Sequence, residues 1–365
     1  MKAGESMHKN FRNVGQLVYG RGAFDQLGLI LDPKRTEGEG YFVFLVDDWF
    51  EDRELPGRLP AVSRDVVRFI DASHEEPKTG QVDELRDEIL SEQGLPAGVV
   101  GIGGGSVMDL AKALSLMFTN EGSSTLYQGL DLIQRPGVWH AGVPTISGTG
   151  AEVSMTAVLT GPEKKLGLKC EWTPFDQLVL DPELTATVPT DHWFYTGMDC
   201  YIHCIEAETG RHFNAFSKSY GDGALWLCRE VFLDEGAGRS PDNDEKLMIA
   251  SLFGGLSLTY SEVGACHAIS YGLSYVLGMR HGIANCVAFR QLRDFYPRGV
   301  DEFEAMVEEH SVHLPEGMAA GWTDAQISRM AEIAYGLPHM WDHAIGPDWA
   351  NEITLDRLES IYRRL

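Results

Sequence analysis

Hydrophobic residues follow two alternating patterns in the first half of the chain. Short apolar runs rich in β-branched and aromatic residues, such as 41–46 (YFVFLV) and 98–102, are typical of buried strands. Between them, segments such as 82–92 and 107–118 repeat their apolar residues at helical spacing. Because strands alternate with helices, we expect an α/β fold with a parallel sheet covered by helices.

The pattern changes near Pro189. Long stretches with apolar residues three and four positions apart follow, and β-rich runs become rare, which predicts an all-helical part. The clearest stretches are 192–209, 214–232, 245–260 and 324–336. Because the change of composition over 181–189 contains no flexible linker, we expect the two parts to pack tightly.

A glycine-rich turn lies between a predicted strand and a predicted helix. Residues 101–106 (GIGGGS) allow positive φ angles and let a phosphate approach the backbone. The helix that follows offers unpaired N–H groups and a partial positive charge. The turn therefore suits a phosphate-binding loop, although a tight strand-to-helix turn without a ligand would look the same. It matches neither the G-x-G-x-x-G pattern nor the P-loop pattern.

Two further polar segments are suited to a nucleotide. Residues 144–152 (PTISGTGAE) carry hydroxyls and glycines that could bind a diphosphate, a ribose or a carboxamide. The same residues could instead form a helix N-cap, with Thr149 capping and Glu152 completing a capping box. Asp47 and Asp48 end the first strong strand, where a carboxylate could accept a hydrogen bond from a ribose 2′-hydroxyl. Asp47 and Asp48 could equally be surface acids without a ligand.

Three histidines and one aspartate form a candidate metal-binding set. Asp199 and His203 are four residues apart in a helical pattern, so they share one helix face. His267 and His281 lie further along the chain. Three imidazoles and one carboxylate suit Zn²⁺ or Fe²⁺, whereas Mg²⁺ and Ca²⁺ prefer oxygen ligands.

The distance between the last two histidines requires a turn. His267 and His281 are 14 residues apart, which in one straight helix corresponds to about 21 Å along the axis. Both can reach one ion only if the chain folds back between them. Gly272 and Gly278 lie in this interval, and we expect the helix to break at these two glycines.

Composition and charge exclude several classes of protein. The 365 residues include 54 Asp and Glu against 30 Lys and Arg, a formal net charge of −24. Nucleic acid and anionic membranes would repel such a chain at long range, so neither is expected as a partner. The polar N-terminus lacks an apolar signal core, which predicts a cytoplasmic location. The six cysteines contain no C-x-x-C pair and are expected to be reduced, packed thiols.

These segments together resemble one known family, the group III, iron-dependent alcohol dehydrogenases, relatives of glycerol dehydrogenase and dehydroquinate synthase. Residues 103–112 are similar to its G-G-G-S-x-x-D-x-A-K motif, and 144–153 to its P-T-T-x-G-T-G-S-E-V segment. Residues 180–206 resemble its D-P-x-L…T-G-x-D-A-x-x-H-x-x-E stretch. The resemblance implies a Rossmann-like NAD-binding domain over 1–185, a helical metal-binding domain over 186–365 and a metal in the cleft between them.

The resemblance also assigns roles to individual residues. The implied metal ligands, for Fe²⁺ or Zn²⁺, are Asp199, His203, His267 and His281. The implied NAD-binding residues are Asp48 (or alternatively Asp47), Gly103, Gly104, Gly105, Ser106, Asp109, Thr145, Thr149 and Lys165. A small-molecule alcohol is the implied substrate, and a homodimer is the implied assembly.

One position departs from the family pattern. Many members have a second histidine four residues after the third ligand, beside the substrate, where this chain has Tyr271. Tyr271 is therefore the candidate catalytic residue. A phenol with an ordinary pKa near 10 is a poor proton acceptor at neutral pH. Its part in proton release stays open, because water or the cofactor ribose could take over.

Two further segments narrow the range of expected substrates. Residues 171–177 and 193–207 look closest to the branch of 3-deoxy-D-manno-octulosonate 8-oxidases, which oxidise the terminal primary alcohol of a lipopolysaccharide sugar acid. The implied reaction is oxidation of that C8 hydroxyl to the aldehyde. The alternatives are a dehydrogenase of a simple polyol or glycerol-like alcohol, and a dehydroquinate-synthase-like lyase with transient use of NAD. Candidate cations for the sugar carboxylate are Arg211, His212, Lys218 and Arg280.

Overall fold

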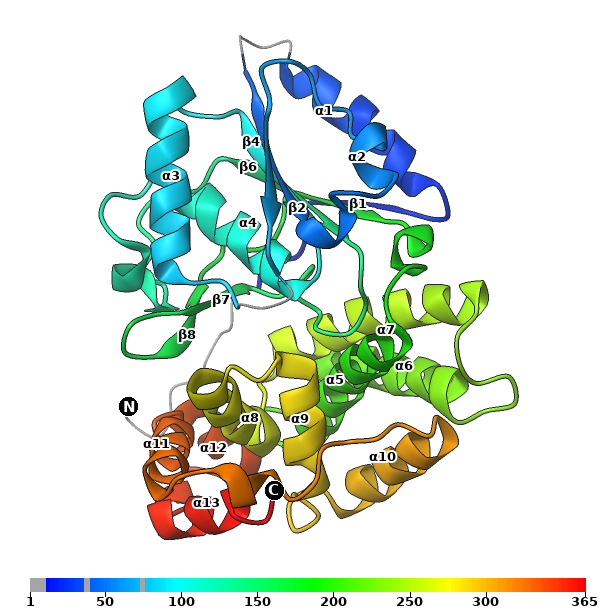
Figure 1. Ribbon diagram of the computed structural model, residues 1–365, viewed down its shortest axis with the longest axis vertical. Coiled ribbons are helices and arrows are strands. Elements are labelled where there is room, and N and C mark those ends of the chain that lie inside the picture. The colour runs from blue at the N-terminus through cyan, green and yellow to red at the C-terminus, as the bar shows by residue number, and fades with distance from the viewer. Residues whose placement is uncertain (1–10, 36–39, 73–75) are drawn as a thin grey trace.

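The computed structural model describes residues 11–35, 40–72 and 76–365. An α/β part that contains the larger sheet lies above a helical part in the view of Figure 1. The predicted fold class, a parallel sheet with helices followed by a helical region, is confirmed.

A six-stranded sheet forms the centre of the α/β part. All its strands are parallel, in the order β1-β9-β6-β4-β2-β3. They are β1 (Gln16–Tyr19), β2 (Phe42–Asp47), β3 (Val66–Ile70), β4 (Gly98–Gly103), β6 (Trp139–Pro144) and β9 (Gln177–Leu180). The accompanying helices are α1 (Leu27–Arg35), α2 (Leu55–Arg58), α3 (Thr79–Gln93) and α4 (Gly105–Met117). Figure 1 shows α3 and α4 on one side of the sheet and α1 and α2 on the other.

Helices cover both faces of the six-stranded sheet, and this explains the continuous apolar run at 41–46. Successive side chains of a strand point to opposite faces. Tyr41, Val43 and Leu45 therefore join the core beneath α3 and α4, whereas Phe44 and Val46 join the core beneath α1. A strand buried on both faces has no polar alternation.

A second, smaller sheet was not predicted from the sequence. Its strands are β5 (Gly129–Leu130), β7 (Thr156–Thr160) and β8 (Lys165–Lys169), in the order β5-β8-β7. β7 and β8 form an antiparallel hairpin. Tyr275 of the helical part donates a hydrogen bond to the backbone oxygen of Pro162 at the tip of this hairpin, at 3.1 Å. The hairpin thus joins the two parts of the molecule.

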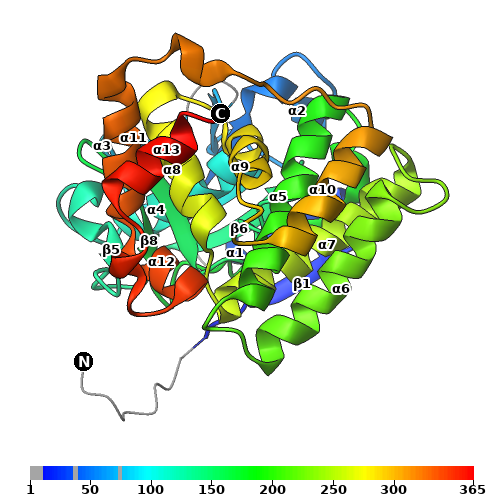
Figure 2. The same cartoon turned by 90° about the horizontal axis from the view of Figure 1, so that it is seen from below.

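The helical part begins at Thr190. Its helices are α5 (Thr190–Thr209), α6 (Ala215–Phe232), α7 (Pro241–Tyr260), α8 (Ala265–Leu277), α9 (His281–Arg290), α10 (Pro297–Glu309), α11 (Asp324–Tyr335), α12 (Pro338–Ile345) and α13 (Leu355–Tyr362). Short 3₁₀ turns occur at Ala23–Gln26, Asp48–Phe50, Ser124–Tyr127, Pro182–Thr185, Met318–Gly321 and Trp349–Asn351. Seen from below in Figure 2, α9 lies between a group containing α5, α6, α7 and α10 and a group containing α8, α11, α12 and α13.

The break expected between the two late histidines occurs at only one of the two glycines. Gly278 adopts φ 66° and ends α8, and the chain re-enters a helix at His281, because glycine alone takes the left-handed conformation freely. Gly272 stays inside α8. A Cβ at Gly272 would lie 2.2 Å from the hydroxyl of Tyr362, so this glycine serves close packing instead of a turn.

Two further observations concern membrane spans and thiols. Within residues 11–35, 40–72 and 76–365, no helix is both long and apolar enough to cross a membrane. All six cysteines are buried and unbridged, as predicted. Burial in apolar surroundings is common for structural thiols and leaves them inert.

Candidate metal and cofactor site

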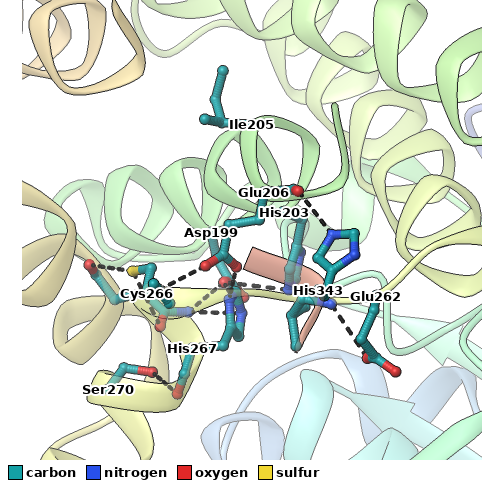
Figure 3. Close-up of polar contacts among 12 residues, drawn as sticks. Asp199, His203, Ile205, Glu206, Glu262, Cys266, His267, Ser270 and His343 are labelled. Atoms are coloured by element: carbon teal, nitrogen blue, oxygen red, sulfur yellow. Dashed lines mark hydrogen bonds and ion pairs between the residues drawn. The ribbon is translucent and has the colours of Figure 1, made fainter. Parts of the chain in front are cut away.

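Three helices bring the four candidate metal ligands together. α5 carries Asp199 and His203, α8 carries His267 near its start, and α9 begins with His281. One donor atom from each of the four lies within 4.8 Å of all the others. Figure 3 shows Asp199, His203 and His267 converging on one point.

The donor atoms are arranged around one carboxylate. The Nε2 atoms of His203 and His267 lie 3.6 and 3.4 Å from Asp199 Oδ1, and that of His281 lies 3.6 Å from Oδ2. Asp199 is fully buried, and its Oδ2 has no hydrogen-bond partner. A buried carboxylate oxygen without a partner is costly, and a cation among these atoms would satisfy it. The N₃O donor set fits Zn²⁺ or Fe²⁺.

The electrostatics of the cluster favour metal binding. Burial alone would raise the pKa of Asp199, but the neighbouring imidazoles, His203 first, outweigh burial and hold that pKa well below its usual range. Burial lowers the pKa of His203 to about 4 and that of His281 to about 3. Both rings are therefore neutral at pH 7 and keep a lone pair for a metal.

Glu206 orients the candidate ligand His267 through Nδ1, the ring nitrogen that faces away from the other donors. Its Oε2 lies 2.5 Å from Nδ1 of His267, and its Oε1 accepts a hydrogen bond from the backbone N–H of Cys266 at 2.7 Å (Figure 3). Burial alone would lower the pKa of His267, but Glu206 and Asp199 raise it to about 9. A carboxylate on Nδ1 holds the ring so that Nε2 faces the other donors, which is the usual support of a metal-bound histidine.

This contact leads to a prediction for Glu206→Gln. We expect the variant to bind Zn²⁺ about 10- to 100-fold more weakly, because the neutral amide orients and polarises His267 less well. Competition with a chromophoric chelator measures the dissociation constant directly. The matched control is Glu208→Gln, an exposed residue two positions along α5. Equal zinc affinity in the two variants would contradict this role of Glu206.

Asn285 is a second supporting residue that the sequence analysis missed. Its amide nitrogen donates to Asp199 Oδ1 at 2.6 Å and lies 3.2 Å from Nε2 of both His267 and His281. Asn285 follows His281 by four residues on α9, one helical turn away. The same i,i+4 spacing that singled out Asp199 and His203 could have identified it. Glu206, three residues after His203, lies in the stretch 180–206 that resembles the family. The resemblance assigned it no role.

The glycine turn lies where a dinucleotide would be expected in a parallel sheet. It joins the carboxyl end of β4 to the start of α4, beside the ends of β2 and β6. Such adjacent carboxyl ends form the usual binding crevice of parallel α/β sheets. Thr145 donates its backbone N–H to Gly103 at 3.0 Å, which ties β6 to the turn. A Cβ at Gly105 would lie 3.1 Å from Oγ1 of Thr149, so the second loop packs directly on the first.

The two acids at the end of β2 have different surroundings. Asp47 caps the following turn by accepting the N–H of Trp49 at 3.0 Å, and it also accepts the N–H of Gly104. Burial raises its pKa. Asp48 belongs to the 3₁₀ turn and is partly exposed. The carboxylate that contacts the glycine turn is thus that of Asp47, whereas the resemblance favoured Asp48 for the cofactor ribose.

The second loop is held from both sides by buried polar groups. From α4, the Lys112 ammonium donates to the backbone oxygens of Ala151, Ser154 and Thr156, the last two at 3.0 Å. From α7, Ser251 accepts the N–H of Gly148 at 2.8 Å. These buried hydrogen bonds from Lys112 and Ser251 rigidify the loop.

The alternative interpretation of this loop as a helix N-cap is wrong. No helix follows Thr149, because residues 151–153 form a turn and the chain then enters β7. Glu152 completes no capping box. It accepts a hydrogen bond from Ser251 at 2.8 Å instead.

Two further candidate cofactor residues, Asp109 and Lys165, are associated with the smaller sheet. Asp109 of α4 accepts the backbone N–H of Val158 at 3.0 Å, and burial raises its pKa to about 6. Lys165, at the start of β8, pairs with Glu76 at 2.7 Å. The Lys165 ammonium also lies 4.6 Å from the centre of the Tyr271 ring, so it reaches the residue one turn after His267.

The cations proposed for a sugar carboxylate are not gathered at the metal ligands. Arg211 and His212 both contact Asp342, at 2.7 and 3.3 Å. Lys218 pairs with Asp222 at 2.8 Å on the surface of α6. Only the fourth candidate, the exposed Arg280, adjoins a ligand, since it directly precedes His281.

Comparison with known proteins agrees with this architecture. Residues 15–182 match the family model described as iron-containing alcohol dehydrogenase, and residues 193–337 match its C-terminal counterpart. The NAD-dependent methanol dehydrogenase of Bacillus methanolicus is 28% identical over 278 residues, which are 74% of this chain and 71% of that protein. The 1,3-propanediol dehydrogenase of Klebsiella pneumoniae is 29% identical over 252 residues, 67% of this chain and 65% of that protein.

Solved structures share the whole fold. The sulfoacetaldehyde reductase from Bifidobacterium kashiwanohense in complex with NAD⁺ superposes with a TM-score of 0.80 and 22% identity, covering 98% of each chain. The two family models together span most of this sequence in the correct order. The chain therefore belongs to the iron-containing alcohol dehydrogenase family, oxidoreductases that act on CH–OH groups and bind NAD and a divalent metal.

Proposed function

We propose that this protein is a metal- and NAD-dependent dehydrogenase that oxidises a primary alcohol to the aldehyde. The observation that carries the proposal is the convergence of Asp199, His203, His267 and His281 within 4.8 Å. Tyr271 lies beside His267 of this cluster, and Lys165, which the resemblance implies as a cofactor contact, lies against the Tyr271 ring. Hydride transfer needs a metal and a dinucleotide that meet at one alcohol, and these residues would hold both groups.

Each group of residues has a distinct task in this proposal. A divalent cation supplies Lewis acidity that lowers the pKa of an alcohol hydroxyl, and NAD accepts the hydride. His203, His267, His281 and Asp199 would hold the cation. The N–H groups at the start of α4 would bind the cofactor diphosphate through Gly103 to Ser106, as helix N-termini bind anions.

The class of alcohol is supported by the relatives. The methanol and 1,3-propanediol dehydrogenases are named for primary alcohols, which supports a primary alcohol here. For the finer substrate we propose the C8 hydroxyl of 3-deoxy-D-manno-octulosonate, with a simple polyol as the alternative. Arg280 is the cation best placed to meet a sugar carboxylate, because the other three candidates are engaged by Asp342 and Asp222.

Formation of NADH by the anaerobically purified protein, with Fe²⁺ or Zn²⁺ restored, tests the proposal. We expect a chelator-sensitive absorbance increase with primary alcohols. A response to the octulosonate but not to simple polyols would support the sugar acid, and the reverse response would discard it. A lyase with transient use of NAD would convert its substrate without accumulating NADH, and that result would overturn the dehydrogenase.

A further inference from the structure

Tyr271 stands beside the metal ligands in a fixed position. It follows His267 by one turn of α8, and its ring centre lies 6.5 Å from that of His267 and 6.0 Å from that of His281. Both ring pairs meet edge to face. Only 8% of the residue is exposed. Tyr271 therefore borders His267 and His281 of the ligand set.

A neighbouring cation restrains the ring. The Lys165 ammonium lies 4.6 Å from the centre of the Tyr271 ring, within the range of a cation–π contact. Lys165 is itself held by Glu76, with its Nζ 2.7 and 2.6 Å from the two carboxylate oxygens. The Tyr271 ring therefore contacts the Lys165 ammonium and two imidazoles of the metal-ligand set.

The hydroxyl of Tyr271 differs from those of the other interior tyrosines. Tyr201 donates to Glu302 at 2.6 Å, Tyr296 to Glu206 at 3.3 Å and Tyr362 to the backbone oxygen of Ile269 at 2.7 Å. Tyr271 makes no hydrogen bond with any residue of the described ranges. Its oxygen is also absent from the buried unpaired polar atoms found there, so it reaches accessible space. A phenol placed in this way has a donor to offer to a ligand.

We propose that the Tyr271 hydroxyl donates a hydrogen bond to a second oxygen of the substrate, on the carbon next to the reacting alcohol, and thereby selects vicinal diols and polyols over simple alcohols. The inference rests on the proposed function and specifies its substrate class. Tyr271 acts here as a donor that stays protonated throughout, so it takes no part in removing the alcohol proton. That proton leaves by another route, through water or the cofactor ribose.

The test compares two alcohols that differ by one hydroxyl, propane-1,2-diol and propan-1-ol. In Tyr271→Phe we expect kcat/KM for the diol to fall about three- to tenfold, the range of one hydrogen bond between neutral groups. We expect a smaller loss of kcat/KM for propan-1-ol, which lacks the second hydroxyl, and we expect the loss for the diol to appear mainly in KM. The matched control is Tyr275→Phe, one turn further along α8, which removes the hydroxyl that binds Pro162. Zinc content is measured for every variant.

A binding measurement separates this inference from the proposed function. The zinc-loaded protein, saturated with ADP-ribose so that no hydride can leave, is titrated with each alcohol by calorimetry. Preference for the diol that is lost in Tyr271→Phe supports the inference even if no NADH forms, in which case only the dehydrogenase proposal fails. Equal losses for both alcohols, or no loss for either, overturn it. A changed pH–rate profile in Tyr271→Phe also overturns it, because a permanent donor does not set that profile.

Discussion

Replacing His267 with alanine is expected to remove both metal retention and NADH formation. The variant deletes one of four donors that lie within 4.8 Å of one another, and a tetrahedral metal site depends on all of its ligands. It also leaves Glu206 buried without its imidazole partner. Breaking a buried ion pair by removing one member costs about 3–5 kcal/mol of folding stability.

Elemental analysis and melting curves together check this prediction. Metal content is measured after gel filtration, well below the unfolding temperature, so that lost binding is not confused with lost structure. His313→Ala removes an exposed histidine from a loop of the same helical part and serves as the control. Wild-type metal content and turnover in His267→Ala would refute the assignment of the metal site.

Substituting alanine for Gly148 is expected to destabilise the protein and weaken NAD binding. Gly148 has φ +148°, and a Cβ there would lie 1.8 Å from the backbone oxygen of Thr196 on α5. Thr196 precedes Asp199 by three residues. Relief of the clash must therefore move either the second cofactor loop or the helix that carries two metal ligands.

Gly20 provides a matched control for this substitution. It has a similar φ of +136°, but nothing lies within 4 Å of a Cβ placed there. Gly20→Ala should lose only the backbone strain, about 1–3 kcal/mol, whereas Gly148→Ala should lose about 1–3 kcal/mol more through overpacking. Urea unfolding gives the stabilities, and titration with NAD gives the dissociation constants. Equal stabilities and equal NAD affinities in the two variants would contradict the predicted clash.

Local patterns in the sequence determined the general architecture. The apolar run at 41–46 predicted a buried strand, and the glycine cluster at 101–106 predicted a turn between a strand and a helix. The helical periods after Pro189 likewise correspond to α5, α6, α7 and α11. These features were predictable because strand and helix periods, and the conformational freedom of glycine, act over a few neighbouring residues.

The tertiary structure decided which side chains meet. Spacing identified Asp199 and His203 as a pair, but only the fold-back after Gly278 brings His281 to them. Glu206 and Asn285 became visible as supports of the ligands only when three helices converged. The hairpin of β7 and β8, which carries Lys165 to Tyr271, left no strong local signal. Such contacts join residues far apart in the chain, and their geometry is set by packing of whole elements, which no short window of sequence contains.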